Sequence, residues 1–218
     1  MRLPVKKILF SAPLELSNDE LSGTKKPTLQ LKEEYVESSK PGEQLCQEIL
    51  CVRSFNGIGK LYLHTVVDTN CGFSFGMLSV LKLAGNAITL LHKAVLPFYK
   101  KCHLRIEQII TSERREFGGR GEKSYENYLK LNGILHQKMN FQHQSNTFLE
   151  RFRETTVEKF IKLKLKELTV FDSIEAIQQD FEIWLQHYNN EPQPSNGNYG
   201  KSPSERIVKY LESINIST

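Results

Sequence analysis

The histidine and cysteine side chains, which could ligate a metal or form a redox pair, have spacings that match neither chemistry. The six histidines form no HxH or HxxxH pattern, and the four cysteines form no CxxC pair, whereas zinc sites space their ligands recognisably. Cys46 and Cys51 are five residues apart, which places them on opposite faces of a strand. GxSxG, P-loop and GxGxxG motifs are also absent from the sequence. We therefore expect reduced, partly buried thiols and no metal held by histidine or cysteine.

Basic side chains are concentrated between residues 138 and 166, and acidic side chains alternate with them. The basic residues are Lys138, Arg151, Arg153, Lys159, Lys162, Lys164 and Lys166. The acidic residues are Glu150, Glu154, Glu158 and Glu167. One interpretation is a solvated helix with i,i+4 ion pairs such as Glu158–Lys162. The other is a stripe that faces nucleic acid. The net charge of +4 does not decide between the two interpretations.

Three aromatic residues near the C-terminal end could form a stacking platform for bases. Phe181, Trp184 and Tyr188 follow one another at i, i+3 and i+7, which is the spacing of a stripe on one face of a helix. We interpret them as core residues of a helix over 173–189.

The elements that position these side chains follow from length and pattern. The chain has 218 residues with 39% apolar content, which suits one domain with tails and a single core. No apolar run approaches the roughly 20 residues of a membrane span, and the N-terminus lacks the apolar region of a signal peptide, so we expect a cytoplasmic protein. Turn and breaker clusters predict a loosely ordered arm over residues 1–43, ahead of a core over 44–190 and a tail over 191–218 with a short helix.

Three β-favouring stretches precede alternating helices and strands in the core. The expected strands are 44–55, 60–69, 73–80, 105–111 and 134–138, and the expected helices are 87–101, 124–133, 146–168 and 173–189. A turn is expected at Asn56-Gly57, and Pro97 is expected to kink or end its helix. This order predicts an α/β fold with a mixed five-stranded sheet flanked by helices, the order of the ribonuclease-H-like fold.

Several segments together resemble the catalytic core of bacterial insertion-sequence transposases in the retroviral-integrase superfamily. The residues 111–117, TSERREF, resemble the family's TDNGxEF motif, and 146–152, NTFLERF, resemble NGxxERF. The stretch YNNEPQP at 188–194 resembles the YNxxRPH motif. The resemblance runs from about Glu34 to Val208 and implies a DNA-integration core. The helix-turn-helix expected ahead of such cores is not found, which suggests a truncated element.

The resemblance also assigns three positions to the carboxylates that hold metals in the family. Glu48 stands at the first position, where the family has Asp, and Glu150 matches the third. Ser112 stands at the second, 38 residues before Glu150 (150 − 112), and a neutral hydroxyl cannot replace a carboxylate ligand. Arg114 replaces a glycine and brings a cation close to where metals should lie. Glu113 is one residue from the required position and is expected to point to the opposite face.

The implied cofactor is Mg²⁺ or Mn²⁺, used by family members for in-line attack on phosphorus. Because one ligand is lost, we expect a catalytically inactive copy with no metal bound and at most residual binding by Glu48 and Glu150. Asp68 and Glu116 are expected to be structural. The implied partner is DNA, contacted by Lys138, Arg151, Arg153 and Lys159.

Three alternatives remain open. One is a DNA-binding or regulatory module that forms a homo-oligomer, or a hetero-oligomer with an active transposase. The second is a nuclease that uses Glu48, Glu113 and Glu150, which requires these three carboxylates to converge. The third is an untranslated or unstable pseudogene product, against which the persistence of the core pattern argues.

Overall fold

The computed structural model describes residues 34–35, 38–55, 59–118, 123–139, 144–145, 147–167, 173–192 and 200–215. The turn expected at Asn56-Gly57, most of the arm expected over 1–43 and residues 193–199 of the expected tail lie outside these residues. Residues 32–218 form one compact unit, to which every element below belongs.

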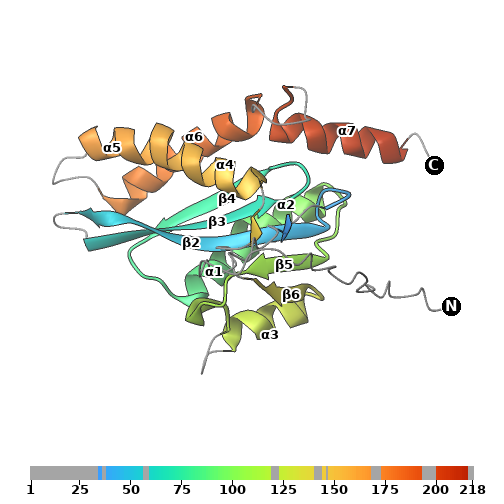
Figure 1. The fold of residues 1–218 in the computed structure, drawn as a ribbon, viewed down its shortest axis with the longest axis horizontal. Helices are drawn as coiled ribbons and strands as arrows, with labels where there is room; N and C mark the ends of the chain where they lie inside the picture. The colour runs from blue at the N-terminus through green and yellow to red at the C-terminus, as the bar shows by residue number, and fades with distance from the viewer. Residues whose placement is uncertain are drawn as a thin grey trace, which may run out of the picture. The chain divides into compact units, whose positions relative to one another are not determined.

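A mixed five-stranded sheet with the strand order β4-β3-β2-β5-β6 is the centre of this unit (Figure 1). Its strands are β2 (Gln44–Phe55), β3 (Gly59–Asp68), β4 (Ser74–Ser79), β5 (Gln108–Thr111) and β6 (Leu135–Lys138). The first three pair antiparallel, whereas β5 runs parallel to β2 and β6 runs parallel to β5. The expected α/β fold with a mixed sheet is confirmed.

Helices cover both faces of the sheet. On one face lie α1 (Ala84–Leu90), α2 (Leu96–Lys101) and α3 (Ser124–Leu131), and on the other lie α4 (Thr147–Thr156), α5 (Lys162–Glu167) and α6 (Ile174–Asn190) (Figure 1). Side chains alternate between these faces along each strand. Leu45 and Ile49 pack on the α1–α3 side, while Cys46 and Ile110 pack on the α4–α6 side. Cys46 is buried and Cys51 is exposed, in agreement with the opposite strand faces that their spacing predicted.

Two π-helical segments interrupt otherwise continuous helices. Leu91–Val95 (η1) joins α1 to α2, and Val157–Ile161 (η3) joins α4 to α5. Pro97 does not end its helix, which continues to Lys101. A proline lacks the N–H for the helical ladder and its ring crowds the carbonyl four residues earlier. The π segment lies at that point, and such segments accommodate an interrupted ladder.

The aromatic residues of α6 pack in the core, as the helical spacing predicted. Phe181 is fully buried, and its ring stacks with Trp184 at 5.7 Å between centroids. Tyr188 meets the ring of Phe152 on α4 edge to face. Ser173 caps this helix, since its Oγ accepts from the backbone N–H of Ala176. These contacts fix α4 against α6.

Two further features lie at the margins of the sheet. A short parallel pair joins β1 (Glu34–Tyr35) to β7 (Gln144–Ser145), which was not expected from the sequence. Helix α7 (Pro203–Asn215) begins with reciprocal hydrogen bonds between Ser202 and Glu205 and packs on α6. Within the part of the chain that the structure describes, no helix is long and apolar enough to cross a membrane.

Candidate functional site

The middle of β2 and the end of β5 bring two of the three candidate positions together. Gln47 pairs with Thr111 in the parallel ladder, so the residues that follow them, Glu48 and Ser112, lie side by side. Both point to the α4 side, because Cys46 and Ile110, two residues earlier on each strand, pack there. The sheet register therefore places Ser112 next to Glu48.

Helix α4 brings the third position over this part of the sheet. Leu149 and Phe152 are buried in the core between α4 and the sheet. Glu150 is half-buried in the first turn of the helix, and Arg153 lies one turn further along. Residues three apart share a helix face. Arg153 reaches Glu48, with 3.9 Å between Nη1 and Oε2, so this face of α4 is directed at the candidate site.

Glu48 is a buried carboxylate with incomplete partners. The residue is 7% exposed, and its Oε1 has no hydrogen-bond partner among the described residues. Burial raises the pKa of the Glu48 carboxyl, and the positive charges of Arg153 and Arg114 oppose this rise. Thr65, its cross-strand neighbour on β3, is also buried, and its hydroxyl likewise has no partner in the described part of the chain.

Arg114 lies in the loop after β5 and contacts β2. Its Nη1 donates a hydrogen bond of 2.7 Å to the carbonyl oxygen of Ile49, the residue after Glu48. The other N–H groups of this exposed guanidinium remain available to solvent. The expectation that Arg114 brings a cation to the candidate metal position therefore agrees with its contact on β2 and its electrostatic effect on Glu48.

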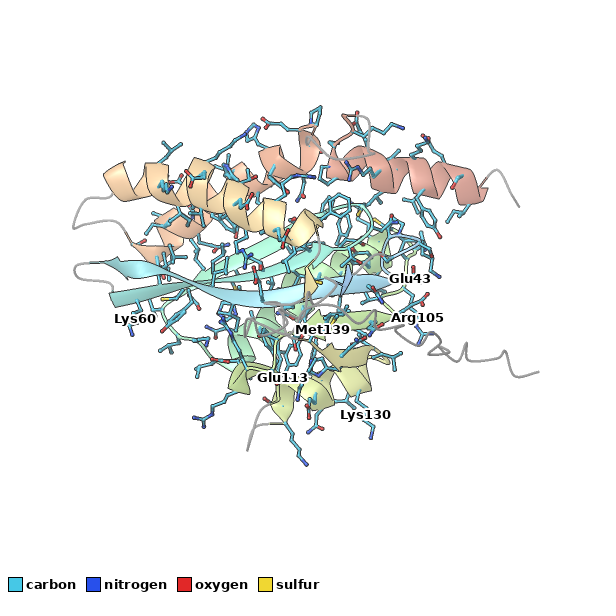
Figure 2. All side chains as sticks on the ribbon, viewed as in Figure 1. Glu43, Lys60, Arg105, Glu113, Lys130 and Met139 are labelled. Carbon is cyan, nitrogen blue, oxygen red and sulfur yellow. The ribbon has the colours of Figure 1, made fainter. Side chains whose placement is uncertain are left out.

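Glu113 is exposed and lies on the side of the sheet away from α4 (Figure 2). Glu116 pairs with Lys82 at 2.6 Å between Nζ and Oε1. Burial would raise the pKa of the Glu116 carboxyl, but the hydrogen bond from Lys82 and its charge lower it overall. Glu116 is thus a structural partner, as expected.

Asp68 also has a structural role. At the end of β3 its carboxylate accepts hydrogen bonds from the backbone N–H groups of Gly42, Asn70 and Cys71. A fourth comes from the hydroxyl of Tyr99 at 2.6 Å. Burial, followed by the negative charge of Asp68, raises the pKa of Tyr99 well above its usual range. These four donors tie the loop after β3, the start of β2 and α2 together.

The residues present do not fit the two-metal site that the resemblance implies. The unpartnered oxygen of Glu48 suits a ligand, but Ser112 is neutral and two guanidinium groups lie beside Glu48. A cation placed there would be repelled by both arginines. The described residues contain no group of three or more histidine, cysteine, aspartate or glutamate side chains that could hold a metal ion.

The four basic residues assigned to DNA occupy different surroundings. Lys138 bonds to Glu126 of α3 and to the carbonyl of Gly118, on the side of the sheet away from α4. Arg151 is partly buried near α6, where its charge acts on Tyr188. Lys159 is exposed on η3, and only Arg153 lies against Glu48.

At the junction of η3 and α5, Lys162 pairs with Glu158, as the interpretation of these residues as i,i+4 ion pairs predicted.

Thr65 is the residue of this site that the sequence interpretation missed. The β2–β3 ladder pairs Phe55 with Gly59, and a bulge between Cys51 and Arg53 shifts the register so that Glu48 pairs with Thr65. The pairing of Glu48 with Thr65 therefore depends on this bulge and not on the turn alone.

The comparisons with known proteins give the fold a class. No protein-family model and no curated protein matches the sequence. Among solved structures, a chain of the simian T-cell lymphotropic virus intasome, in complex with PP2A regulatory subunit B56 gamma, is 14% identical with a TM-score of 0.62. The match covers 84% of this chain, which spans 60% of the intasome chain.

The matches with two isolated catalytic cores cover nearly the whole of each core. The HTLV-2 integrase catalytic core domain, in complex with magnesium in a trimeric form, matches with a TM-score of 0.56, 14% identity and 78% and 99% of the two chains covered. The BIV integrase catalytic core domain matches with a TM-score of 0.52, 16% identity and 81% and 98% covered. The chain therefore has the ribonuclease-H-like fold of an integrase catalytic core.

Proposed function

We propose that this chain is a transposase or integrase core homologue that binds DNA in the cytoplasm and lacks metal-dependent strand-transfer activity. The observation that carries the proposal is the surface formed by Glu48, Ser112 and Glu150. The fold brings these positions to one side of the sheet, yet a hydroxyl stands at the second and arginines lie beside the first. The bacterial insertion-sequence origin and the decay of the site belong to the same proposal, supported by the sequence motifs.

The chemistry of the donor set supports an inactive site. In-line transfer at phosphorus on divalent metals needs anionic oxygen ligands around the metals. Here Glu48 and Glu150 are the only carboxylates at the three positions, and the positive charges of Arg114 and Arg153 lie beside Glu48. The nuclease alternative is disfavoured by the same geometry, because Glu113 is exposed on the other side of the sheet.

Manganese titration by calorimetry tests the metal part of the proposal, because Mn²⁺ suits carboxylate oxygens. We expect wild type and Glu150→Gln to show the same heat, at the level of dilution. Saturable binding by wild type that Glu150→Gln abolishes would show a working metal site and end the proposal. A DNA-nicking assay run with the same two proteins gives the corresponding activity readout.

A restoration variant sharpens this test. Glu48→Asp, Ser112→Asp and Arg114→Gly combined supply three carboxylates and remove one guanidinium. We expect this triple variant to bind Mn²⁺ while wild type does not. The matched control combines Glu48→Asp, Ser112→Asn and Arg114→Gly, which differs by one carboxylate alone. Equal behaviour of the two triple variants contradicts the assignment of Ser112 to the missing ligand.

A second candidate function is a regulatory module that forms a homo-oligomer, or a hetero-oligomer with an active transposase. It is favoured by the fold likeness to HTLV-2 integrase cores, which have been solved in dimeric and trimeric forms. Sedimentation equilibrium of the purified chain tests self-association. A strictly monomeric chain over the accessible concentration range leaves only the hetero-oligomer, which is tested by adding the chain to an active transposase and measuring strand transfer.

A further inference from the structure

The two arginines beside Glu48 come from different elements and converge on one carboxylate. Arg114 follows β5 and is fixed by its bond to the Ile49 carbonyl, 2.7 Å long. Arg153 extends from α4, and its Nη1 lies 3.9 Å from Glu48 Oε2, beyond hydrogen-bond distance. Glu48 therefore attracts this guanidinium without using its N–H groups. Both cations retain several donors for an external ligand.

The order of burial decides which charge an approaching ligand meets. The side chain of Glu48 is 9% exposed, whereas that of Arg153 is 43% exposed and Arg114 is exposed. The acid thus lies beneath the guanidinium groups, and solvent faces the cations. At Glu48 an approaching ligand therefore meets the two guanidinium groups first, and these attract an anion.

We infer that Arg114 and Arg153 bind a DNA phosphodiester directly at the surface formed by Glu48, Ser112 and Glu150, without any divalent cation. The inference rests on the DNA-binding role proposed above. A guanidinium presents a planar fork of N–H groups that matches two phosphate oxygens, and Ser112 adds a neutral hydroxyl that does not repel the phosphate. Because the arginines supply the positive charge themselves, Mg²⁺ adds nothing to binding at this surface.

The test is fluorescence anisotropy of a fluorescein-labelled DNA duplex with the full chain, in EDTA and in MgCl₂, between about 50 and 200 mM KCl. The variants are Arg114→Gln and Arg153→Gln. The matched control is Lys130→Gln, which removes one exposed positive charge from α3 (Figure 2). Arg114→Lys and Arg153→Lys keep the charge but not the fork, and thermal melting checks that every variant is folded.

We expect wild type to bind equally in EDTA and in MgCl₂. Each glutamine variant binds about tenfold more weakly, the loss of roughly one charge-assisted contact. Each also makes the dependence of log K on log[KCl] shallower by about 1. The lysine variants fall between, and Lys130→Gln equals wild type.

Three results overturn the inference in distinguishable ways. Wild-type binding that needs MgCl₂ ends the inference and leaves a metal-dependent DNA-binding role standing. Glutamine variants that bind as wild type does end the inference and leave the DNA-binding role standing at another surface. Absence of wild-type binding in both buffers at the lowest salt ends the DNA-binding role and the inference together.

Discussion

Protonation of the buried His64 ring is expected to destabilise the folded chain as the pH falls. His64 lies on β3 and is fully buried. Its Nε2 is 2.9 Å from Ser79 Oγ, which itself donates to the carbonyl of Leu81. Nε2 is therefore assigned the proton of the neutral ring, and Nδ1 has no hydrogen-bond partner among the described residues. A proton added there would place a buried charge without an acceptor.

The magnitude follows from the pKa of this ring. Burial lowers the pKa of His64 from 6.5 to about 4. At about 1.4 kcal/mol for each unit of pKa, the difference corresponds to about 3 kcal/mol in the free energy of unfolding. Because the folded pKa is below the unfolded one, the unfolded chain binds more protons between these values. The contribution of His64 is fully present above pH 6.5 and is lost as the pH falls towards 4.

Urea unfolding of wild type and His64→Leu, at several pH values from about 7.5 down to 4, measures this contribution. The variant removes the titrating ring, so wild type should lose about 3 kcal/mol more than His64→Leu across the range. His187→Leu, at an exposed position on α6, is the matched control and should follow wild type. Equal losses by wild type and His64→Leu would refute the reasoning, whatever their stabilities at neutral pH.

Three further substitutions test other parts of the fold. In urea unfolding, Glu48→Gln should gain stability relative to wild type as the pH rises from about 4 to 8. Burial raises the pKa of the Glu48 carboxyl, so its ionisation costs folding free energy that the glutamine variant does not lose. A loss of stability of the variant relative to wild type with rising pH would show that the attraction of the neighbouring arginines dominates. Asp68→Asn should cost about 2–4 kcal/mol in thermal unfolding, because the amide NH₂ replaces one carboxylate oxygen and then faces two of the four donors, such as the Gly42 N–H and the Tyr99 hydroxyl at Oδ2; an unchanged melting temperature would argue against the network. Gly76→Ala should cost about 1–3 kcal/mol, since its Cβ would lie 2.6 Å from the ring of Phe181, whereas Gly85→Ala, with open space around it in α1, should be neutral or stabilising.

Local pattern determined the elements and most strand faces. The apolar alternation of β2 and β3 and the helical spacing of α6 are properties of neighbouring residues, so the sheet and its flanking helices could be predicted. The face of Glu113 relative to Ser112 also follows from the two-residue period of a strand. The short β1–β7 pair and the π segments were missed, because their pairing depends on distant residues or on crowding around Pro97.

The tertiary structure alone decided which charges meet. Seven basic residues between 138 and 166 look like one stripe in the sequence, yet Lys138 lies on the opposite side of the sheet from Arg153. Strand register and the docking of α4 on the sheet separate them, and both are set by contacts between residues far apart in the chain. The resemblance in the sequence by itself predicted that a carboxylate is missing at Ser112. Only the packing of α4 and of the loop after β5 placed Arg153 and Arg114 beside the carboxylate of Glu48.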